Sequence, residues 1–292
     1  MDNDNRSTSF LSGFFNTCRN KLRRFSKWCV SLFDFGKQAW KEHVPMTKAK
    51  AERMLKRGLP RGTKVSVKVD SDGQGRLELD ASYISEVTKS FDLDKKVAYS
   101  GYMELAKTGK GIGRKIMRNQ IEFFIASGCE KLEMHAGLNA GGYTWARLGF
   151  LPYDKGEYKD DFRELRQEVR ERYKKVAPLL SDSEKERMDE ILKFKDAKAV
   201  WKLADSRIDL GKRLRDVFKA AANDDRKAQR LEEKLSPLVD SDDLKGDKPQ
   251  PIGRILLAGT SWHGEMDFKD KAQMKRVSDY VGGLEAKPPA PH

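Results

Sequence analysis

The chain has 292 residues, with 58 lysines and arginines against 45 aspartates and glutamates, which gives a formal net charge of +13. Apolar residues make up 38% and charged residues 35%, and this balance predicts one modest core with solvated helix faces. Three cysteines, Cys18, Cys29 and Cys129, form no CxxC pair and no Cys/His cluster, which argues against a disulfide framework and a structural metal site. A reducing, cytoplasmic compartment is therefore expected.

The positive charge favours a polyanionic partner: a nucleic acid or ribonucleoprotein, an anionic membrane surface, or the phosphates of CoA. Plain solubility is the alternative. No run of residues approaches the roughly 18 apolar residues of a membrane span. Basic residues interrupt the apolar residues near the start, which is unlike a signal peptide.

Residues 1–45 are expected to contain a basic amphipathic helix. Apolar residues recur there at alternating steps of four and three and share one helical stripe: Leu11, Phe15, Cys18, Leu22, Phe25, Cys29 and Leu32. Such a stripe can be the seam for a partner helix. It can also lie on an anionic membrane through residues 11–36, or pack on its own domain. All three interpretations stay open.

A helix is predicted over residues 47–57, ended by Gly58 and Pro60. After Pro60 the spacing of the apolar residues changes, and every second residue is apolar. Residues 65–69 read as a strand, residues 70–75 as a turn, and Leu77 and Leu79 begin a returning strand. A third strand is expected over residues 97–105. The segment 46–154 is thus the predicted α/β domain.

A glycine-rich segment, Thr108-Gly109-Lys110-Gly111-Ile112-Gly113-Arg114-Lys115, lies between that strand and the next predicted helix. Glycines let the backbone approach a ligand, and the free N–H groups at a helix start suit a pyrophosphate. The segment is neither a Walker A loop nor a GxGxxG fingerprint. A simple tight turn is the alternative.

The helix that follows is expected to close at Ser127-Gly128. Leu132, Met134 and Ala136 alternate with polar residues as a strand, and a short helix follows over residues 140–148. Strand, helix, strand and helix in this order form a βαβ-type unit, so part of the sheet should be parallel or mixed.

The loop and the segment 135–150 together resemble the GNAT family of N-acetyltransferases. That family pairs an Arg/Gln-xxGxG/A loop after its fourth strand with a strand, an Asn, a short helix and a final Gly-Phe. Gly111 and Gly113 match the loop, Asn139 matches the Asn, and Gly149-Phe150 match the end of the helix. Thr108 replaces the usual Arg or Gln, and Trp145 stands where many members have a Tyr that serves as general acid.

The resemblance implies a fold of the α/β (α+β) class, a GNAT-like mixed sheet flanked by helices. It implies acetyl-CoA as the cofactor, with the thioester in a splay between strands four and five. The implied cofactor-binding residues are Met103, Leu105, Gly109, Lys110, Gly111, Ile112, Gly113, Arg114 and Asn139. Glu104 and His135 are the candidates for the base that deprotonates an amine, and Tyr143 is the candidate acid.

Residues 155–245 read as a mostly helical insertion, with a capping box expected at residues 183–186 and helices over 193–204 and 210–235. Residues 240–251 are a polar linker. A hairpin of residues 255–258 and 262–268, followed by a helix over 270–280, is expected to complete the sheet, so that residues 252–282 belong to it. The proline-rich tail at 283–292 should be disordered.

The first functional hypothesis is acetyl transfer from acetyl-CoA to an unidentified amine, near nucleic acid or on a small molecule. The second is a catalytically inactive protein of the same fold with a structural or delivery role, such as a phage virion protein, which uses the N-terminal helix on a membrane or partner. The third, a nucleic-acid-binding module, depends on charge alone.

Overall fold

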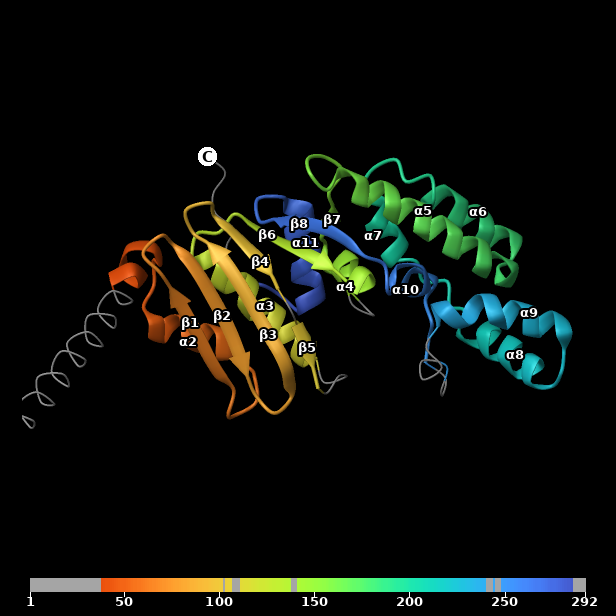
Figure 1. Ribbon diagram of the computed structural model, residues 1–292, viewed down its shortest axis with the longest axis horizontal. Helices are drawn as coiled ribbons and strands as arrows, with labels where there is room; N and C mark the ends of the chain where they lie inside the picture. Colours follow the sequence, from red (N-terminus) through yellow and green to blue (C-terminus); the bar gives the residue numbers. More distant parts are fainter. Residues whose placement is uncertain are drawn as a thin grey trace, which may run out of the picture.

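The computed structural model describes residues 38–101, 103–106, 111–137, 141–239, 244 and 248–285. The predicted helix at 11–36 and the tail from 286 lie outside these residues. The protein is of the mixed α/β class, with an eight-stranded mixed sheet flanked by helices (Figure 1). Among the described helices, none is both long and apolar enough to cross a lipid bilayer.

The strands run in the order β1-β2-β3-β4-β6-β8-β7, and the short β5 pairs with β3. Only β4 and β6 pair in parallel, and the other pairs are antiparallel. The strand, turn and returning strand predicted for residues 65–79 are thus confirmed as an antiparallel hairpin. The predicted mixed sheet is confirmed too. The strands are β1 (Lys64–Val69), β2 (Gln74–Asp80), β3 (Ile84–Asp92), β4 (Val97–Ser100), β5 (Met103–Leu105), β6 (Lys131–Ala136), β7 (Leu151–Pro152) and β8 (Trp262–Asp267).

One prediction about these strands is wrong, and one strand was missed. The single strand expected over residues 97–105 is broken at Gly101 into β4 and β5, which pair with different parts of β3. Strand β3 itself was not predicted. Its inward residues Val87, Lys89 and Phe91 alternate with outward ones, but a lysine inside this alternation hides the apolar period.

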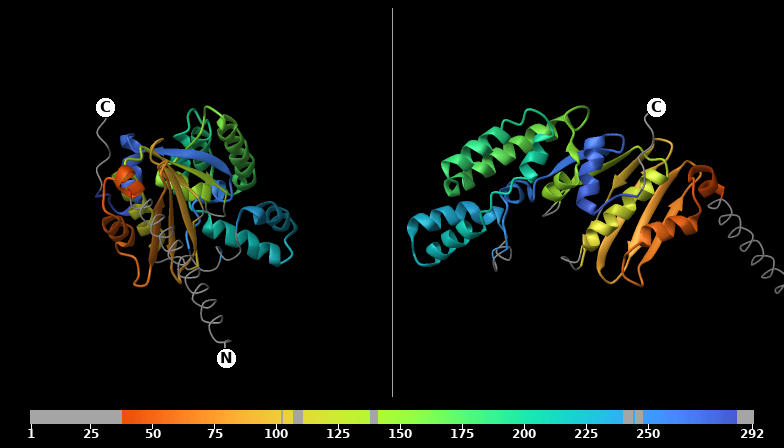
Figure 2. Two further views of the ribbon diagram at one scale, coloured as in Figure 1. Left: turned by 60° about the vertical axis from the view of Figure 1, so that its left-hand side comes forward. Right: turned by 180° about the vertical axis from the view of Figure 1, so that it is seen from behind.

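Four helices lie on one face of the sheet: α2 (Lys48–Lys56), α3 (Ile112–Ala126), α4 (Gly141–Leu148) and α11 (Lys271–Val281). The view from behind shows α2, α3 and α11 in front of the strands (Figure 2). Phe91 of β3 meets Phe123 and Phe124 of α3, with ring centroids 5.8 and 5.9 Å apart. The core thus lies between this helical layer and the sheet.

The remaining helices separate β7 from β8 along the chain, although β7 and β8 are neighbours in the sheet. They are α5 (Lys159–Val176), α6 (Asp182–Ile191), α7 (Ala199–Ala204), α8 (Gly211–Ala222), α9 (Arg226–Leu235) and α10 (Ile252–Leu257), with 3-10 turns at Ala177–Leu179 and Ser236–Leu238. Figure 1 shows α5, α6, α8 and α9 standing beside the sheet rather than on its face.

Several boundaries in this part differ from the predictions. Ser181, not Ser183, caps α6, through a capping box with Glu184. The helix expected over 193–204 is only α7, and the one over 210–235 is interrupted between α8 and α9, where Asp225 caps α9. The predicted late hairpin is absent, because residues 252–257 form α10. Strand β8 alone joins the sheet here, between β6 and β7.

Candidate functional site

Strands β4 and β6 separate at a defined point. Their parallel pairing ends at Ser100 and Met134, and the chain then turns away so that β5 pairs with β3. Strand β6 continues for two more residues, paired only with β8. We call the opening between β5 and residues 135–137 the notch.

Gly101 makes this separation possible. A β-carbon at Gly101 would lie 2.7 Å from the carbonyl oxygen of Thr88, which is too close for any other residue. The Gly101 N–H donates to the carbonyl oxygen of Tyr99 at 3.1 Å, which tightens the turn. Lys89 holds the same turn from β3: its Nζ donates to Ser100 Oγ at 2.8 Å and to the Gly101 carbonyl oxygen at 3.3 Å.

The N-terminus of α3 lies against β5 at one end of the notch. A β-carbon at Gly113 would lie 3.3 Å from Leu105 Cδ1. Gly111 is the N-cap residue in the left-handed conformation (φ 68°), and a β-carbon there would meet nothing within 4 Å. No side chain caps this helix and its first turn holds no acidic residue. The helix end therefore presents N–H groups and partial positive charge to open space.

The other predicted cofactor residues fall into three groups. Gly109, Lys110 and Asn139 lie outside the described residues. Met103, Leu105 and Ile112 are half-buried against the core. Arg114 is exposed, and its guanidinium lies 5.0 Å from the centre of the Tyr280 ring of α11.

The two candidate bases lie on one face of the sheet, on opposite sides of the notch. Glu104 pairs with Glu86 of β3 and shares its outward face, and it is exposed. His135 alternates with the buried Met134 and Ala136, so it also lies on the face opposite the core.

His135 belongs to a stack of rings on this open face. Its ring lies 4.2 Å from that of His263, and His263 lies 4.2 Å from Tyr158 of the segment before α5. His135 Nε2 is 2.9 Å from Ser261 Oγ. Partial desolvation, and then the charge of His263, lower the pKa of His135. Its imidazole is thus neutral at neutral pH and can accept a proton.

Acidic groups surround the stack. Asp161 Oδ2 accepts hydrogen bonds from the His263 backbone N–H at 2.7 Å and faces His263 Nδ1 at 2.8 Å. Tyr153 lies beside Glu133 and Glu265, and burial, followed by these carboxylates, raises its pKa, so the phenol keeps its proton. Lys131 already pairs with Glu133 at 2.6 Å and with Glu265 at 3.5 Å, so Asp161 is the acidic group that contacts the ring stack.

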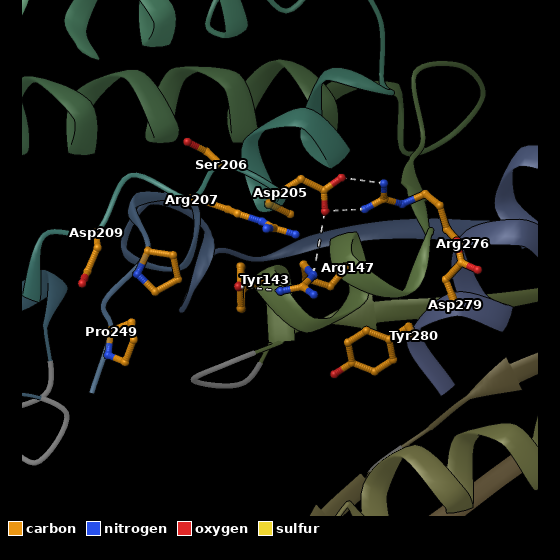
Figure 3. A pocket seen from close by; sticks show the side chains of 12 residues that line it. Tyr143, Arg147, Asp205, Ser206, Arg207, Asp209, Pro249, Arg276, Asp279 and Tyr280 are labelled. Carbon is orange, nitrogen blue, oxygen red and sulfur yellow. Dashed lines mark hydrogen bonds and ion pairs between the residues drawn. The ribbon is translucent and has the colours of Figure 1, made fainter. Parts of the chain in front are cut away.

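Tyr143, the candidate acid, lies elsewhere. It lines a cavity of about 670 Å³ between α4, α11, the segment that joins α7 to α8, and the residues just before α10; we call it the junction pocket (Figure 3). Tyr143 OH accepts a hydrogen bond from Arg147 Nη1 at 3.0 Å. The pocket is lined by Tyr143, Arg147, Ala204, Asp205, Ser206, Arg207, Asp209, Pro249, Pro251, Arg276, Asp279 and Tyr280.

The charges in the junction pocket are partly paired. Arg276 forms a two-pronged ion pair with Asp205, at 2.7 and 3.0 Å (Figure 3). Asp279 pairs with Lys275 at 2.7 Å. Arg147 lies 5.9 Å from the centre of the Tyr280 ring, the ring over which Arg114 also lies. The Tyr280 ring therefore contacts both Arg114, at the start of α3, and Arg147, in the junction pocket.

Trp145, which stands where a Tyr acid would be expected from the sequence resemblance, is a packing residue. Its ring meets Phe150 edge-on, with centroids 5.0 Å apart. It offers no acidic hydroxyl at that position. The acid expected there must come from another group if the chain performs acyl transfer.

Sequence reasoning missed Lys89, Asp161, His263 and Tyr280. Only Lys89 left a local signal, a lysine inside an apolar alternation, because the other three gain their role from contacts with distant segments. Within the described ranges, no group of three or more His, Cys, Asp or Glu side chains is arranged to hold a metal. Comparison with protein-family models, with curated proteins and with solved structures found no match to this chain.

Proposed function

We propose that this protein is a GNAT-like N-acyltransferase that transfers an acetyl group directly from acetyl-CoA to an amine. The observation that carries the proposal is the notch: two parallel strands separate at Ser100 and Met134, next to an uncapped helix N-terminus. A thioester needs such an opening to reach an acceptor on the far side of a sheet.

The residues at the notch fit this cofactor. Strand β5 pairs with β3 on one side, and its other edge faces the notch without a strand partner among the described residues. That edge can bond the amides of a pantetheine arm. The amides at the start of α3, with the open space at Gly111 and the nearby Arg114 and Lys115, suit a pyrophosphate.

The junction pocket fits the nucleotide end. Its volume of about 670 Å³ is in the range of small-molecule sites. Tyr280 offers a ring face, and Arg147 and Arg207 offer guanidinium groups for a phosphate. Arg114 over the Tyr280 ring connects this pocket with the pyrophosphate position.

The acceptor amine approaches from the open face. Asp161, beside the ring stack, favours a cationic group there, and a cationic amine must lose a proton before it attacks. His135, with its lowered pKa, is the favoured base because it lies at the notch and is neutral. Glu104, across the notch, is the second candidate.

Isothermal titration of CoA and acetyl-CoA into the protein tests this function. Two glycines at opposite ends of α3 give a matched pair: Gly111 and Gly128 both have positive φ, and neither has an atom within 4 Å of its β-carbon position. Gly111→Glu and Gly128→Glu therefore add the same charge and the same strain. We expect Gly111→Glu to abolish binding and Gly128→Glu to leave it unchanged. Equal affinity in both variants, or no binding by the wild type, would contradict the proposal.

The alternative, an inactive structural or delivery protein, draws support from Trp145, which packs on Phe150 where an acid is expected. Deletion of residues 1–37 tests its membrane-binding helix. The deletion should stop there, because Trp40 and Val44 are buried in the core. This alternative predicts that pelleting with anionic vesicles is lost in the truncated protein. Equal pelleting of both proteins would dismiss it.

A further inference from the structure

Lys89 is a lysine that the fold has placed in its core. Its side chain is 1% exposed, and no carboxylate lies within ion-pair distance of it among the described residues. Its two hydrogen bonds go to Ser100 Oγ and to the Gly101 carbonyl oxygen, the residues at which β4 leaves β6. Burial lowers the pKa of Lys89 to about 7. A buried lysine without a counter-ion costs stability, which makes a functional role a reasonable expectation.

Lys89 and His135 lie on opposite faces of the sheet at the same notch. Lys89 alternates with the outward Thr88 and Ser90 and shares the inward face with Phe91. His135 is on the open face. The start of α3, where the proposed cofactor enters, is on the face of the sheet that the helices cover (Figure 2), and Lys89 is on this same inward face. An acyl donor would therefore meet Lys89, and an acceptor would meet His135.

Another buried polar side chain in the same layer has no hydrogen-bond partner among the described residues. Gln120 of α3 is 1% exposed, and neither its Oε1 nor its Nε2 has a hydrogen-bond partner in the described structure. It lies one helical turn before Phe124, which packs on Phe91. Because α3 and β3 run in the same direction, Gln120 and Lys89 lie on the same side of this aromatic contact. The layer beneath the notch thus contains an amide with no partner, which a bound polar ligand would satisfy.

We infer that Lys89 is the proton donor for the sulfur atom that leaves when the acyl group passes through the notch. The inference rests on the proposed function. The bond between the acceptor nitrogen and the acyl carbon forms, and the bond between the acyl carbon and sulfur breaks with its electron pair on sulfur. The cationic amine first releases one proton to water through His135. After the attack His135 takes the second proton from the nitrogen, and the Lys89 ammonium gives one proton to the sulfur. Exchange of one proton with water restores both side chains.

A proton donor at Lys89 explains how the chain can have Trp145, which is not an acid, at the position where a Tyr acid was expected. A lysine with its ordinary pKa would hold its proton too firmly to release it to a thiolate, whereas one near neutrality gives it up readily. The ammonium also stabilises negative charge that develops on sulfur in a site with little water.

The test is the pH dependence of acetyl transfer from acetyl-CoA to hydroxylamine by the full chain. We expect the wild-type rate to fall as the pH rises through about 7, because Lys89 then loses the proton that it donates. Lys89→Met should still bind CoA, transfer at least about tenfold more slowly and lack this fall. Lys68→Met, an exposed lysine on β1, is the matched control and should behave as the wild type.

Each outcome decides between the two proposals. A wild-type rate that does not fall above pH 7 overturns the role of Lys89 even if the Lys89→Met variant does not fold. Equal rates and pH profiles in wild type and Lys89→Met also overturn it and leave the proposed function standing. A wild type that does not bind CoA overturns the proposed function, and the role of Lys89 with it.

Discussion

The imidazole rings of His135 and His263 are stacked, with centroids 4.2 Å apart and 12° between their planes. The two residues are directly paired across β6 and β8. Other groups close to this pair are Asp161, Tyr158 and Ser261. Two positive charges at this distance repel, so the charge of one ring opposes protonation of the other.

Replacement of His263 should therefore raise the pKa of His135. In His263→Asn, His135 loses both the neighbouring charge and part of the ring that desolvates it, and these are the two causes of its lowered pKa. NMR titration of the His135 ring measures the change. His43→Asn, which alters a histidine near Asp94, is the control and should leave His135 as it is. A lower or unchanged His135 pKa in His263→Asn would refute this account.

Lys89 makes a second pH-dependent prediction, on stability. Its pKa is about 7 in the folded protein and near 10.5 in the unfolded chain. Between these values the unfolded chain binds more protons, so the stability of the wild type rises with pH. Between pH 7 and 9 the gain should be about 2–3 kcal/mol relative to Lys89→Met, in which this group is absent. Urea unfolding at the two pH values measures it. If the free energy of unfolding changes with pH by the same amount in the wild type and in Lys89→Met, Lys89 does not titrate in this range.

Adjacent glycines at the start of α4 should respond very differently to alanine. A β-carbon at Gly142 would lie 2.3 Å from Thr260 Oγ1 and 2.4 Å from the Leu257 carbonyl oxygen, whereas one at Gly141 has its nearest neighbour at 3.7 Å. Gly142→Ala should lower the free energy of unfolding by about 1–3 kcal/mol because α4 must move away from α10. Gly141→Ala should change it by less than about 0.5 kcal/mol. Thermal unfolding compares them, and equal melting temperatures would count against this packing.

Asp161 should anchor the helical insertion to the sheet. It accepts the His263 backbone N–H and faces the His263 ring, while the neighbouring Asp160 forms only an ion pair with Arg163 at 3.1 Å. Both aspartates are in the first turn of α5, so replacement removes the same interaction with the helix dipole. Asp161→Ala should lower the free energy of unfolding by about 2 kcal/mol, and Asp160→Ala should lower it by well under about 1 kcal/mol. If chemical denaturation shows that both variants lose the same free energy of unfolding, the contact of Asp161 with His263 contributes nothing to stability.

The elements predicted correctly have a strong local period. Helix α3 repeats apolar residues at helical spacing, and β1 and β6 alternate cleanly, so the local pattern was sufficient for each. The run from Ile255 to Ala258 is too short for its period to separate a strand from a buried helix turn, and it belongs to α10. Strand β3 was missed because Lys89 interrupts its apolar face.

Part of the candidate site could be read from the sequence in the same way. The glycines before α3 and the placement of His135 on a strand are local features. The break at Gly101 depends on the carbonyl of Thr88, and the ring stack depends on His263, which is far along the chain. No local pattern encodes such contacts, because they exist only once distant strands are paired.

The position of β8 also affects how the protein reaches its folded state. Strand β7 pairs only with β8, and β8 fills the space between β6 and β7, yet the whole helical insertion separates β7 from β8 in the chain. Closing so long a loop is a slow, non-local step. Until it happens, one edge of β6 is open to pairing with another chain, which is an aggregation hazard. Ser261 and His263 arrive with β8, so the environment of His135 is completed only by this late step.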